Sequence, residues 1–155
     1  IMIYGIFDLD DTLIMHYLGM TYDDIQPSPA LYNSLAQFPG NRYILTNATL
    51  DHAEDILKRL GIYKLFEKIY SRDTTELLKP SLVLAQKVNQ DIGITPNDTV
   101  YFFDDLVNNL WMGKKTGWKT IWIHPDHKMS HHMQWIDIAN DNVVDAINDI
   151  LHKPF

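Results

Sequence analysis

The sequence contains no cysteine among its 155 residues. This absence excludes a disulfide framework, a zinc–thiolate site and a cysteine nucleophile. It also fits a reducing compartment, so we expect a cytoplasmic protein. No apolar run approaches the ~18 residues of a membrane-spanning helix, and we therefore expect no contact with a membrane. The first residues already read as a core strand, so we expect no signal peptide.

Basic residues are scarce as well. Only 13 lysines and arginines stand against 20 aspartates and glutamates, which gives a formal net charge of −7. Because nucleic-acid-binding proteins usually carry a basic patch, we expect no extended nucleic-acid binding. Hydrophobic residues make up 46% and charged residues 21% of the chain, as in ordinary globular proteins. The length predicts a single domain over residues 1–155.

Predicted strands and helices alternate along the sequence. Apolar runs predict strands at 3–7, 43–45, 68–71, 100–103 and 119–124, and a short edge strand at 134–138. Apolar stripes and end signals predict helices at 30–37, 49–60, 81–91, 106–115 and 141–151. This alternation predicts an α/β fold, in which a doubly wound parallel sheet has helices on both faces and so forms three layers.

Two carboxylates follow the first predicted strand. Asp8 and Asp10 stand two positions apart in the run FDLDDTL at 7–13. In extended chain this spacing puts both side chains on the same side, where their repulsion would raise one pKa. A hard divalent cation such as Mg²⁺ removes that repulsion, and the pair can then divide the roles of nucleophile and general acid/base. The alternative is an ordinary Asp-rich turn or helix cap.

Polar residues also follow the second predicted strand and precede the 81–91 helix. Thr46 and Asn47 end the strand 43–45, where a hydroxyl and free backbone N–H groups can hold a phosphate. The alternative is that Thr46 and Thr49 only cap the next helix. Lys79 precedes Pro80, which suits the first position of a helix, and from there its amine can reach a phosphoryl oxygen. The alternative for Lys79 is a solvated surface residue.

An acidic pair, Asp104 and Asp105, ends the strand predicted at 100–103. Charged side chains are almost never left unpaired at the end of a buried strand. The pair therefore indicates a bound cation or a basic partner.

Together these residues resemble the four motifs of the haloacid dehalogenase superfamily of phosphatases, in the superfamily's order and over most of the chain, from Ile3 to about His124. The order argues against the receiver domains of two-component signalling, in which the lysine comes last, whereas Lys79 precedes Asp104. The dehalogenases of the superfamily act without metal and lack the second aspartate of the first motif, so Asp10 argues against that branch.

The resemblance implies a Rossmann-like core and a Mg²⁺-dependent phosphomonoesterase. The cation would be held by the carboxylates of Asp8 and Asp104 and by the backbone carbonyl of Asp10. Asp8 would be the nucleophile that forms a phospho-aspartate, and Asp10 would be the general acid/base. Asp105 would lie behind the metal ligands and hold either Lys79 or a metal-bound water.

The resemblance also assigns the phosphate-binding residues. Thr46, the N–H of Asn47 and the amine of Lys79 would neutralise the phosphoryl oxygens, with Thr46 and Lys79 counted among the catalytic residues. The segment from Asn47 to Pro125 looks closest to pyrimidine 5′-nucleotidase-like members. The expected substrate is therefore a small phosphorylated metabolite such as a nucleoside monophosphate.

The segment between the first two motifs is short. Relatives with a helical cap insert it there, but only 38 positions separate Asp8 from Thr46. Once the core helix and strand are set aside, roughly residues 14–29 remain, which suits a hairpin flap and no large cap. Tyr17 and Tyr22 in this flap could stack on a base, although packing against the core is the favoured interpretation.

Three functions follow from this pattern. The first choice is a small-molecule phosphomonoesterase. The second is a capless phosphatase of a phosphoprotein or of a nucleic-acid terminal phosphate; a homo-oligomer, in which a neighbouring subunit covers the site, is also compatible. The third is a catalytically silent binding module, against which the five intact motif residues argue.

A group of histidines follows the strand 119–124. His124, His127, His131 and His132 have spacings that zinc sites also use. The segment contains proline, aspartate and serine, so we interpret it as a solvated loop and favour no metal site there.

Overall fold

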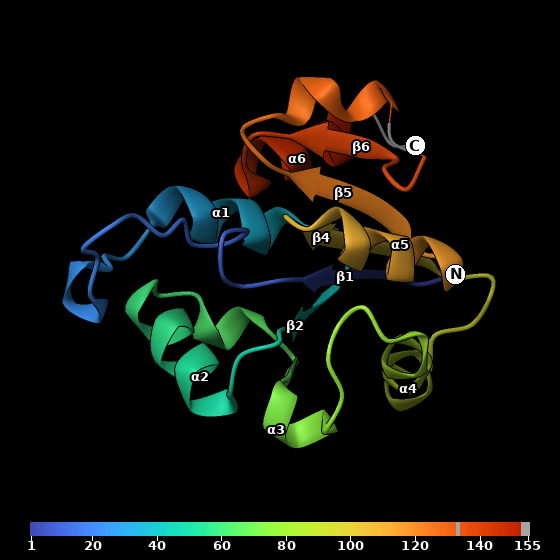
Figure 1. The fold of residues 1–155 in the computed structure, drawn as a ribbon, viewed down its shortest axis with the longest axis horizontal. Coiled ribbons are helices and arrows are strands. Elements are labelled where there is room, and N and C mark those ends of the chain that lie inside the picture. Colours follow the sequence, from blue (N-terminus) through green and yellow to red (C-terminus); the bar gives the residue numbers. More distant parts are fainter. Residues whose placement is uncertain (133, 153–155) are drawn as a thin grey trace.

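A single sheet of six parallel strands forms the centre of the computed structural model, which describes residues 1–132 and 134–152, with the side chains of 130–132 left aside (Figure 1). The strands lie in the order β3-β2-β1-β4-β5-β6, and each pairs with its neighbour in parallel. Their bounds are β1 Ile3–Phe7, β2 Asn41–Leu45, β3 Lys68–Tyr70, β4 Thr99–Asp104, β5 Lys119–Ile123 and β6 Ile138–Asn140. The predicted α/β fold is confirmed.

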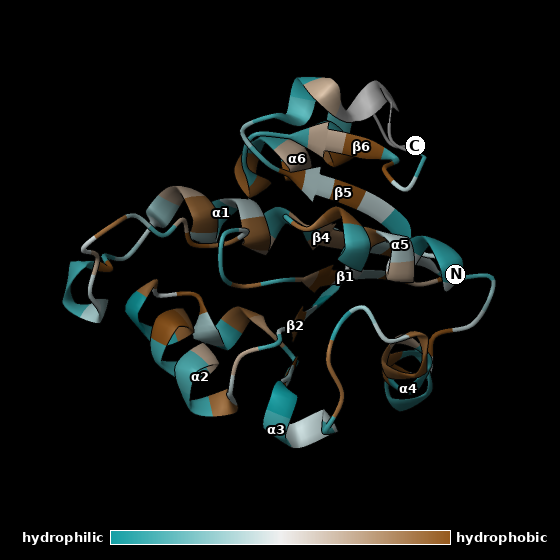
Figure 2. Cartoon of the chain, viewed as in Figure 1, coloured by the Kyte–Doolittle hydropathy of each residue, from teal (hydrophilic) through white to brown (hydrophobic). Residues whose placement is uncertain are grey.

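Helices cover both faces of the sheet. Residues of α1 (Pro29–Gln37), α2 (Leu50–Arg59) and α6 (Val143–His152) share one hydrophobic core with the strands. Residues of α4 (Leu82–Ile92) and α5 (Val107–Lys115) share the other. Figure 2 shows α4 apolar on one side and polar on the other, as expected of a helix that covers a sheet. None of the described helices is long and apolar enough to cross a membrane.

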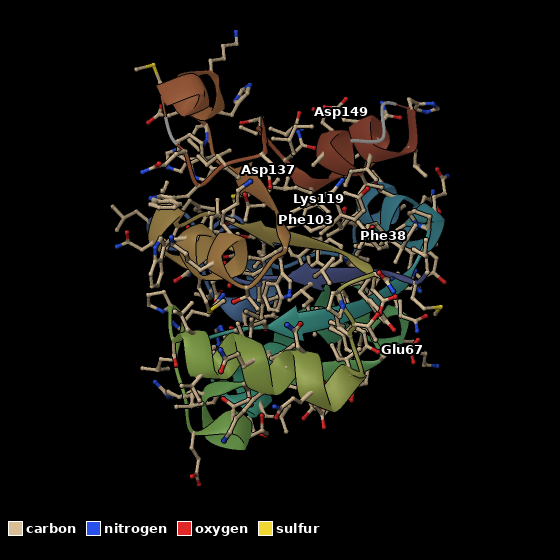
Figure 3. All side chains as sticks on the ribbon, turned by 90° about the vertical axis from the view of Figure 1, so that its right-hand side faces the viewer. Phe38, Glu67, Phe103, Lys119, Asp137 and Asp149 are labelled. Atoms are coloured by element: carbon tan, nitrogen blue, oxygen red, sulfur yellow. The ribbon has the colours of Figure 1, made fainter. Side chains whose placement is uncertain are left out.

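Aromatic rings from the two central strands, β1 and β4, stack on each other. The rings of Phe7 and Phe103 stack with centroids 4.3 Å apart, and Phe38 meets both rings edge-on. Figure 3 labels Phe38 and Phe103 among the side chains. Such aromatic pairs contribute about 0.5–1.5 kcal/mol each beyond the area they bury. Phe7 and Phe103 are also register partners in the β1–β4 ladder. The residues that follow them therefore emerge side by side at the carboxyl edge of the sheet.

The last strand begins later than the sequence predicts. The expected strand at 134–138 is wrong, because β6 covers Ile138–Asn140. The cause is Thr120, whose hydroxyl donates to the Trp135 carbonyl (2.6 Å) and accepts from the Asp137 N–H (3.1 Å). The Asp137 carboxylate in turn accepts from the Thr120 N–H (2.8 Å). Side chains thus take part in the hydrogen bonds before β6, where the Asp137 N–H also donates to the Thr120 carbonyl (3.0 Å).

The helix starts show a second departure. Pro80 is not the first residue of a helix, because α4 begins at Leu82 and Ser81 caps it by accepting from the Leu84 N–H. A four-residue helix, α3 (Arg72–Thr75), was not predicted. Ser71 precedes it in a capping box, in which the side chains of Ser71 and Thr74 each accept from the other residue's backbone N–H.

The flap at 14–29 is not a hairpin. An isolated β-bridge pairs Asp10 with Ile14 at its start, and a short 3₁₀ turn, η1 (Tyr22–Asp24), follows. Tyr17 is 62% and Tyr22 44% exposed, so the expected packing of both rings against the core is wrong. No large cap stands over the sheet within residues 1–132 and 134–152.

The histidine segment forms a 3₁₀ helix, η3 (His127–His132), where the sequence predicts a loop. The His124 ring stacks on Trp122 with centroids 4.7 Å apart. The side chains of His131 and His132 lie outside the described part of the structure.

Candidate active site

The predicted site residues meet at the carboxyl edge of the sheet. Asp8 follows β1 and Asp104 ends β4, and the Asp8 N–H donates to the Phe103 carbonyl (2.9 Å). Thr46 follows β2 and continues that edge by donating its N–H to the Tyr70 carbonyl (2.9 Å). Asp8, Thr46 and Asp104 are all buried. Parallel sheets bind their ligands at this edge, where the strand order reverses between β1 and β4.

Lys79 connects the two central carboxylates. Its Nζ donates to Asp8 Oδ1 at 2.9 Å and to Asp104 Oδ2 at 2.8 Å, and its side chain is only 1% exposed. Burial acts to lower the pKa of Lys79, but the charges of Asp104 and Asp8 outweigh it and raise that pKa above its ordinary value. A buried ammonium is tolerated because two hydrogen-bonded carboxylates replace the water it loses. Lys79 is therefore cationic and fixed beside Asp8.

Asn47 holds the backbone of Lys79 through its side chain. The Lys79 N–H donates to Asn47 Oδ1 (2.8 Å), and Asn47 Nδ2 donates to the Lys79 carbonyl (3.2 Å). The sequence assigns Asn47 only a backbone N–H for phosphate. Its side chain thus has a role that sequence reasoning missed.

Two further polar residues belong to the site and were not predicted. Thr12 donates its hydroxyl to Asp8 Oδ2 (3.0 Å) and lies 3.4 Å from Asp105 Oδ1. Asn109 on α5 donates its amide to both carboxylate oxygens of Asp104 (3.3 and 3.2 Å), which also accepts from the Leu106 N–H (2.9 Å). The threonine of the FDLDDTL run was the available signal for Thr12. For Asn109 the signal was its place about one helical turn after the acidic pair.

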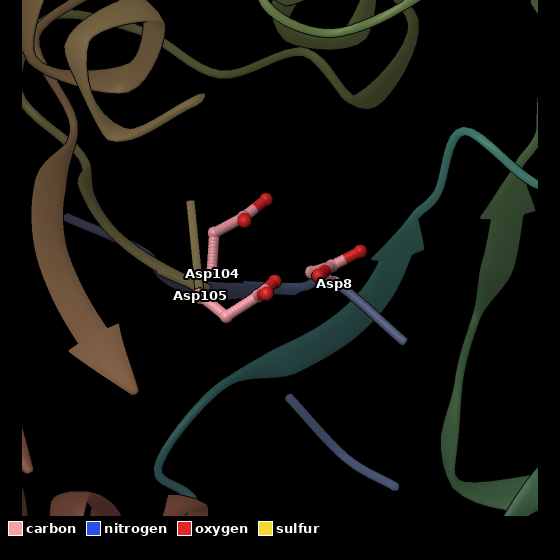
Figure 4. A group of neighbouring side chains, drawn as sticks. All are labelled: Asp8, Asp104 and Asp105. Carbon is pink, nitrogen blue, oxygen red and sulfur yellow. The ribbon is translucent and has the colours of Figure 1, made fainter. Parts of the chain in front are cut away.

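Three carboxylates form a cluster that suits a divalent cation. Asp8, Asp104 and Asp105 each offer an oxygen, and these oxygens lie within 4.8 Å of one another (Figure 4). Burial, a hydrogen bond shared with Asp8, and the charges of Asp104 and Asp8 raise the pKa of Asp105 to about 8. Such a concentration of negative charge favours a cation, and oxygen ligands suit Mg²⁺. The donor set present therefore fits the predicted metal.

Asp10 stands apart from this cluster. Its carboxylate contacts two imidazoles, with His16 Nε2 2.6 Å from Oδ1 and His52 Nε2 3.1 Å from Oδ2. The turn that carries it is tight, because Asp11 adopts a left-handed conformation (φ 61°) and accepts from the His16 N–H with its side chain (3.1 Å). The two aspartates of the first motif thus have different surroundings. The sequence did not predict that His16 and His52 contact Asp10.

A cavity of about 410 Å³ opens over these groups. Its lining includes Asp8, Asp10, Thr46, Asn47, Lys79 and Asp105. A slightly larger cavity, about 450 Å³, lies between β3 and α4, and none of the predicted site residues lines it. The cavity at the carboxyl edge is therefore the candidate active site, although it is the smaller of the two.

Comparisons with known proteins show the family of the chain. The model of the haloacid dehalogenase-like hydrolase family matches residues 25–123, which is more than half of the chain. An L-2-haloacid dehalogenase structure from Xanthobacter autotrophicus is similar at 18% identity with a TM-score of 0.67. That match covers 85% of this chain but only 64% of the dehalogenase chain.

Two structures with phosphatase names are similar as well. The core domain of a protein named as a putative phosphoglycolate phosphatase, from Streptococcus pneumoniae, matches at 19% identity with a TM-score of 0.68, over 98% of this chain and 96% of that one. A predicted phosphoglycolate phosphatase from Haemophilus somnus matches at 19% identity with a TM-score of 0.64, over 80% of this chain and 55% of that one. At these identities the likeness shows the fold, and the family match shows the relationship. The chain belongs to the haloacid dehalogenase-like hydrolase family.

Proposed function

We propose that this hydrolase is a Mg²⁺-dependent phosphomonoesterase that acts through a phospho-aspartate on Asp8. One observation carries the proposal: Asp8 lies in a buried carboxylate cluster with Lys79, whereas Asp10 is held outside that cluster with its carboxylate at the cavity. This separation gives the two aspartates the different environments that a nucleophile and a general acid/base require.

The cation would be held by Asp8 and Asp104, with the backbone carbonyl of Asp10, and Asp105 completes the acidic surroundings. When bound, Mg²⁺ would neutralise charge on the phosphate oxygens. Asp105 and Lys79 do not contact each other in the way considered from the sequence: Lys79 binds Asp8 and Asp104, and Asp105 lies beside Thr12.

Asp8 is oriented for attack by two donors. Lys79 binds Oδ1 and Thr12 binds Oδ2, so the carboxylate cannot rotate without losing one bond. An Asp8 oxygen attacks phosphorus as the ester P–O bond breaks, and Asp10 donates its proton to the departing oxygen. Asp10 then takes a proton from the water that attacks the phospho-aspartate, which releases phosphate and restores Asp8.

The phosphate would be bound by Thr46, the N–H of Asn47 and Lys79. Thr46 already accepts the Ala48 N–H with its hydroxyl (3.0 Å), which fixes that turn, and Asn47 fixes the backbone of Lys79. Donors fixed before the reaction cost no reorganisation when negative charge develops. The substrate we propose is a small phosphorylated metabolite such as a nucleoside monophosphate, because the segment from Asn47 to Pro125 resembles pyrimidine 5′-nucleotidase-like members.

A second function has one observation in its favour. The described flap is short and exposes Met15, Tyr17 and Leu18 to solvent, so a large substrate could approach the site. The alternative function is therefore a phosphatase of a phosphoprotein or of a nucleic-acid terminal phosphate. In a homo-oligomer, a neighbouring subunit could cover the site instead of a cap.

The test is phosphate release from a panel of phosphomonoesters with Mg²⁺ and again with EDTA. The panel contains pyrimidine and purine monophosphates, sugar phosphates, a phosphopeptide, a 3′-phosphorylated oligonucleotide and an aryl phosphate. Mg²⁺-dependent turnover of mononucleotides that Asp8→Asn abolishes is the expected result. Turnover of the peptide or oligonucleotide alone would favour the alternative.

A parallel assay of halide release from a 2-haloacid tests the dehalogenase reaction. Halide release without phosphate release would overturn the proposal. No reaction with any compound, the aryl phosphate included, would instead favour a silent binding module.

A further inference from the structure

Asp10 is connected to a chain of hydrogen-bonding side chains that the proposed mechanism does not use. His52 Nε2 lies 3.2 Å from Asp10 Oδ1 and 3.1 Å from Oδ2, and His52 Nδ1 lies 2.5 Å from the Tyr22 hydroxyl. His16 contacts the same carboxylate at Oδ1 (2.6 Å). The three partners come from two places in the sequence, since His16 and Tyr22 belong to the flap and His52 belongs to α2.

The partners decide which nitrogen of His52 carries the proton. An ionised carboxylate, and the unprotonated oxygen of a protonated one, only accept hydrogen bonds, so Nε2 is the donor toward that oxygen of Asp10. In the neutral ring Nδ1 is then an acceptor, and the Tyr22 hydroxyl can donate to it. The hydrogen bonds then run in one order: the Tyr22 hydroxyl donates to His52, and His52 donates to Asp10. This arrangement orients the imidazole as outer partners orient ligating histidines in metal sites.

A second contact holds the flap on α2 near His52. Arg59 Nη1 donates to the Tyr22 carbonyl (3.1 Å), and the guanidinium lies 5.7 Å from the centroid of the Tyr22 ring. Asp55, one turn earlier on α2, holds Arg59 in place (3.0 Å). Tyr22 is therefore fixed at its backbone and at its hydroxyl, although its ring is partly exposed.

The hydrogen-bond chain also borders a cavity of about 280 Å³ between the flap and α2. Its lining residues are His16, Met20, Thr21, Tyr22, Ile25 and His52. His16 and His52 are therefore shared between this cavity and the carboxylate of Asp10. The flap cavity therefore offers imidazole, phenol, hydroxyl and apolar side chains.

We infer that His52 and Tyr22 are positioning residues, which hold the carboxylate of Asp10 toward the leaving-group oxygen at the entrance of the flap cavity. The inference rests on the proposed phosphomonoesterase function and deepens it. It assigns the leaving group to the cavity between the flap and α2. His52 acts through Asp10, since its Nε2–H already donates a hydrogen bond to that carboxylate.

The inference predicts a dependence on the leaving group. An alcohol with a poor leaving tendency needs the proton of Asp10, whereas a nitrophenolate leaves without it. We therefore compare 4-nitrobenzyl phosphate with 4-nitrophenyl phosphate, which have rings of similar size but leaving groups of very different acidity. The measured quantity is kcat/KM with Mg²⁺, because it reports the first phosphoryl transfer and excludes the later hydrolysis common to both esters.

Loss of the hydrogen bond from His52 to Asp10 should slow hydrolysis of the benzyl ester only. His52→Phe keeps a planar ring but removes both nitrogens, and we expect kcat/KM for the benzyl ester to fall ~10–100-fold, the range found when outer partners are removed. The nitrophenyl ester should change less than about threefold, since its transfer does not depend on proton donation. His52→Gln, which can still donate from Nε2, should restore most of the loss. Tyr22→Phe should show the same preference with a smaller effect.

Controls separate this role from a structural one. Tyr32→Phe on α1 and His152→Gln at the end of α6 change exposed residues outside the network and should leave both esters unaffected. If His52→Phe does not fold, Tyr22→Phe decides, because its exposed ring loses only a hydroxyl. Equal losses on both esters, no loss on either, or a Gln variant no better than Phe would overturn the inference. If the unaltered protein hydrolyses neither of these esters nor any phosphomonoester of the panel above, the proposed function fails, and the inference fails with it.

Discussion

The side-chain amide of Asn47 brackets the backbone of Lys79, accepting its N–H at 2.8 Å and donating to its carbonyl at 3.2 Å. The two residues come from different loops, one after β2 and one before α4. This pair of bonds is what brings a lysine from outside the central strands to the carboxylates of β1 and β4.

Removal of the Asn47 side chain should therefore move Lys79. We expect Asn47→Ala to lower the free energy of unfolding by about 1–3 kcal/mol, the usual cost of leaving buried polar groups unpaired, and to lower kcat/KM as well. Urea denaturation and phosphate release would measure the two effects. Asn108→Ala is the matched control, because Asn108 is exposed on α5. Equal behaviour of the two variants would contradict this role of Asn47.

Lys79 should matter for stability as well as for activity. Lys79→Met keeps the length of the side chain but leaves the buried carboxylates of Asp8 and Asp104 without their cation. Breaking a buried ion pair in this way typically costs about 3–5 kcal/mol, and we expect that loss in urea denaturation without metal. Lys87→Met, at an exposed position of α4, should be nearly neutral. A Lys79 variant as stable as this control would show that the ion pairs contribute nothing.

The two aspartates of the first motif should fail in different ways. Asp8→Asn should abolish turnover, because an amide cannot act as the nucleophile. Asp10→Asn should lower the rate ~10²–10⁴-fold, the usual contribution of a general acid/base, while Asp8 can still be phosphorylated by an activated ester. Steady-state kinetics and trapping of the phospho-protein distinguish the two. Full Mg²⁺-dependent activity of Asp8→Asn would refute its assignment as nucleophile.

The acidic cluster predicts a pH-dependent stability in the absence of metal. The pKa of Asp105 in the folded protein is about 8, against about 4 in an unfolded chain. Between these values the folded state binds more protons than the unfolded state, so the contribution of Asp105 to stability falls as pH rises from about 4 to about 8. Mg²⁺ should oppose this loss, since a cation relieves the repulsion within the cluster.

Thermal unfolding in EDTA at pH 5.5, 7 and 8.5 would test this prediction. Asp105→Asn should remove part of the decline in Tm with pH, and Mg²⁺ should raise the Tm of the unaltered protein most at pH 8.5. Asp126→Asn, which changes an exposed carboxylate after β5, is the control. An Asp105 variant with the same pH profile as the unaltered protein would exclude Asp105 as the source.

Much of the fold could be predicted from local pattern. Apolar runs marked the positions of β1, β2, β4 and β5, and the polar residues that follow them placed Asp8, Thr46 and Asp104 at one edge of the sheet. The errors arose where a side chain competes with the backbone. Before β6, the Thr120 hydroxyl binds the Trp135 carbonyl and the Asp137 N–H. Pro80 was expected at the first position of a helix, but Ser81 caps a helix that begins at Leu82.

The class of fold, the family resemblance and the chemical types at the site follow from residue order and periodicity alone. The pairing of the side chains depends on the tertiary structure. Lys79 lies between Asp8 and Asp104, and His52 meets Asp10 across 42 positions of sequence. Such pairings depend on how α2, the flap and the loop before α4 pack on the sheet, and no spacing along the chain encodes that geometry.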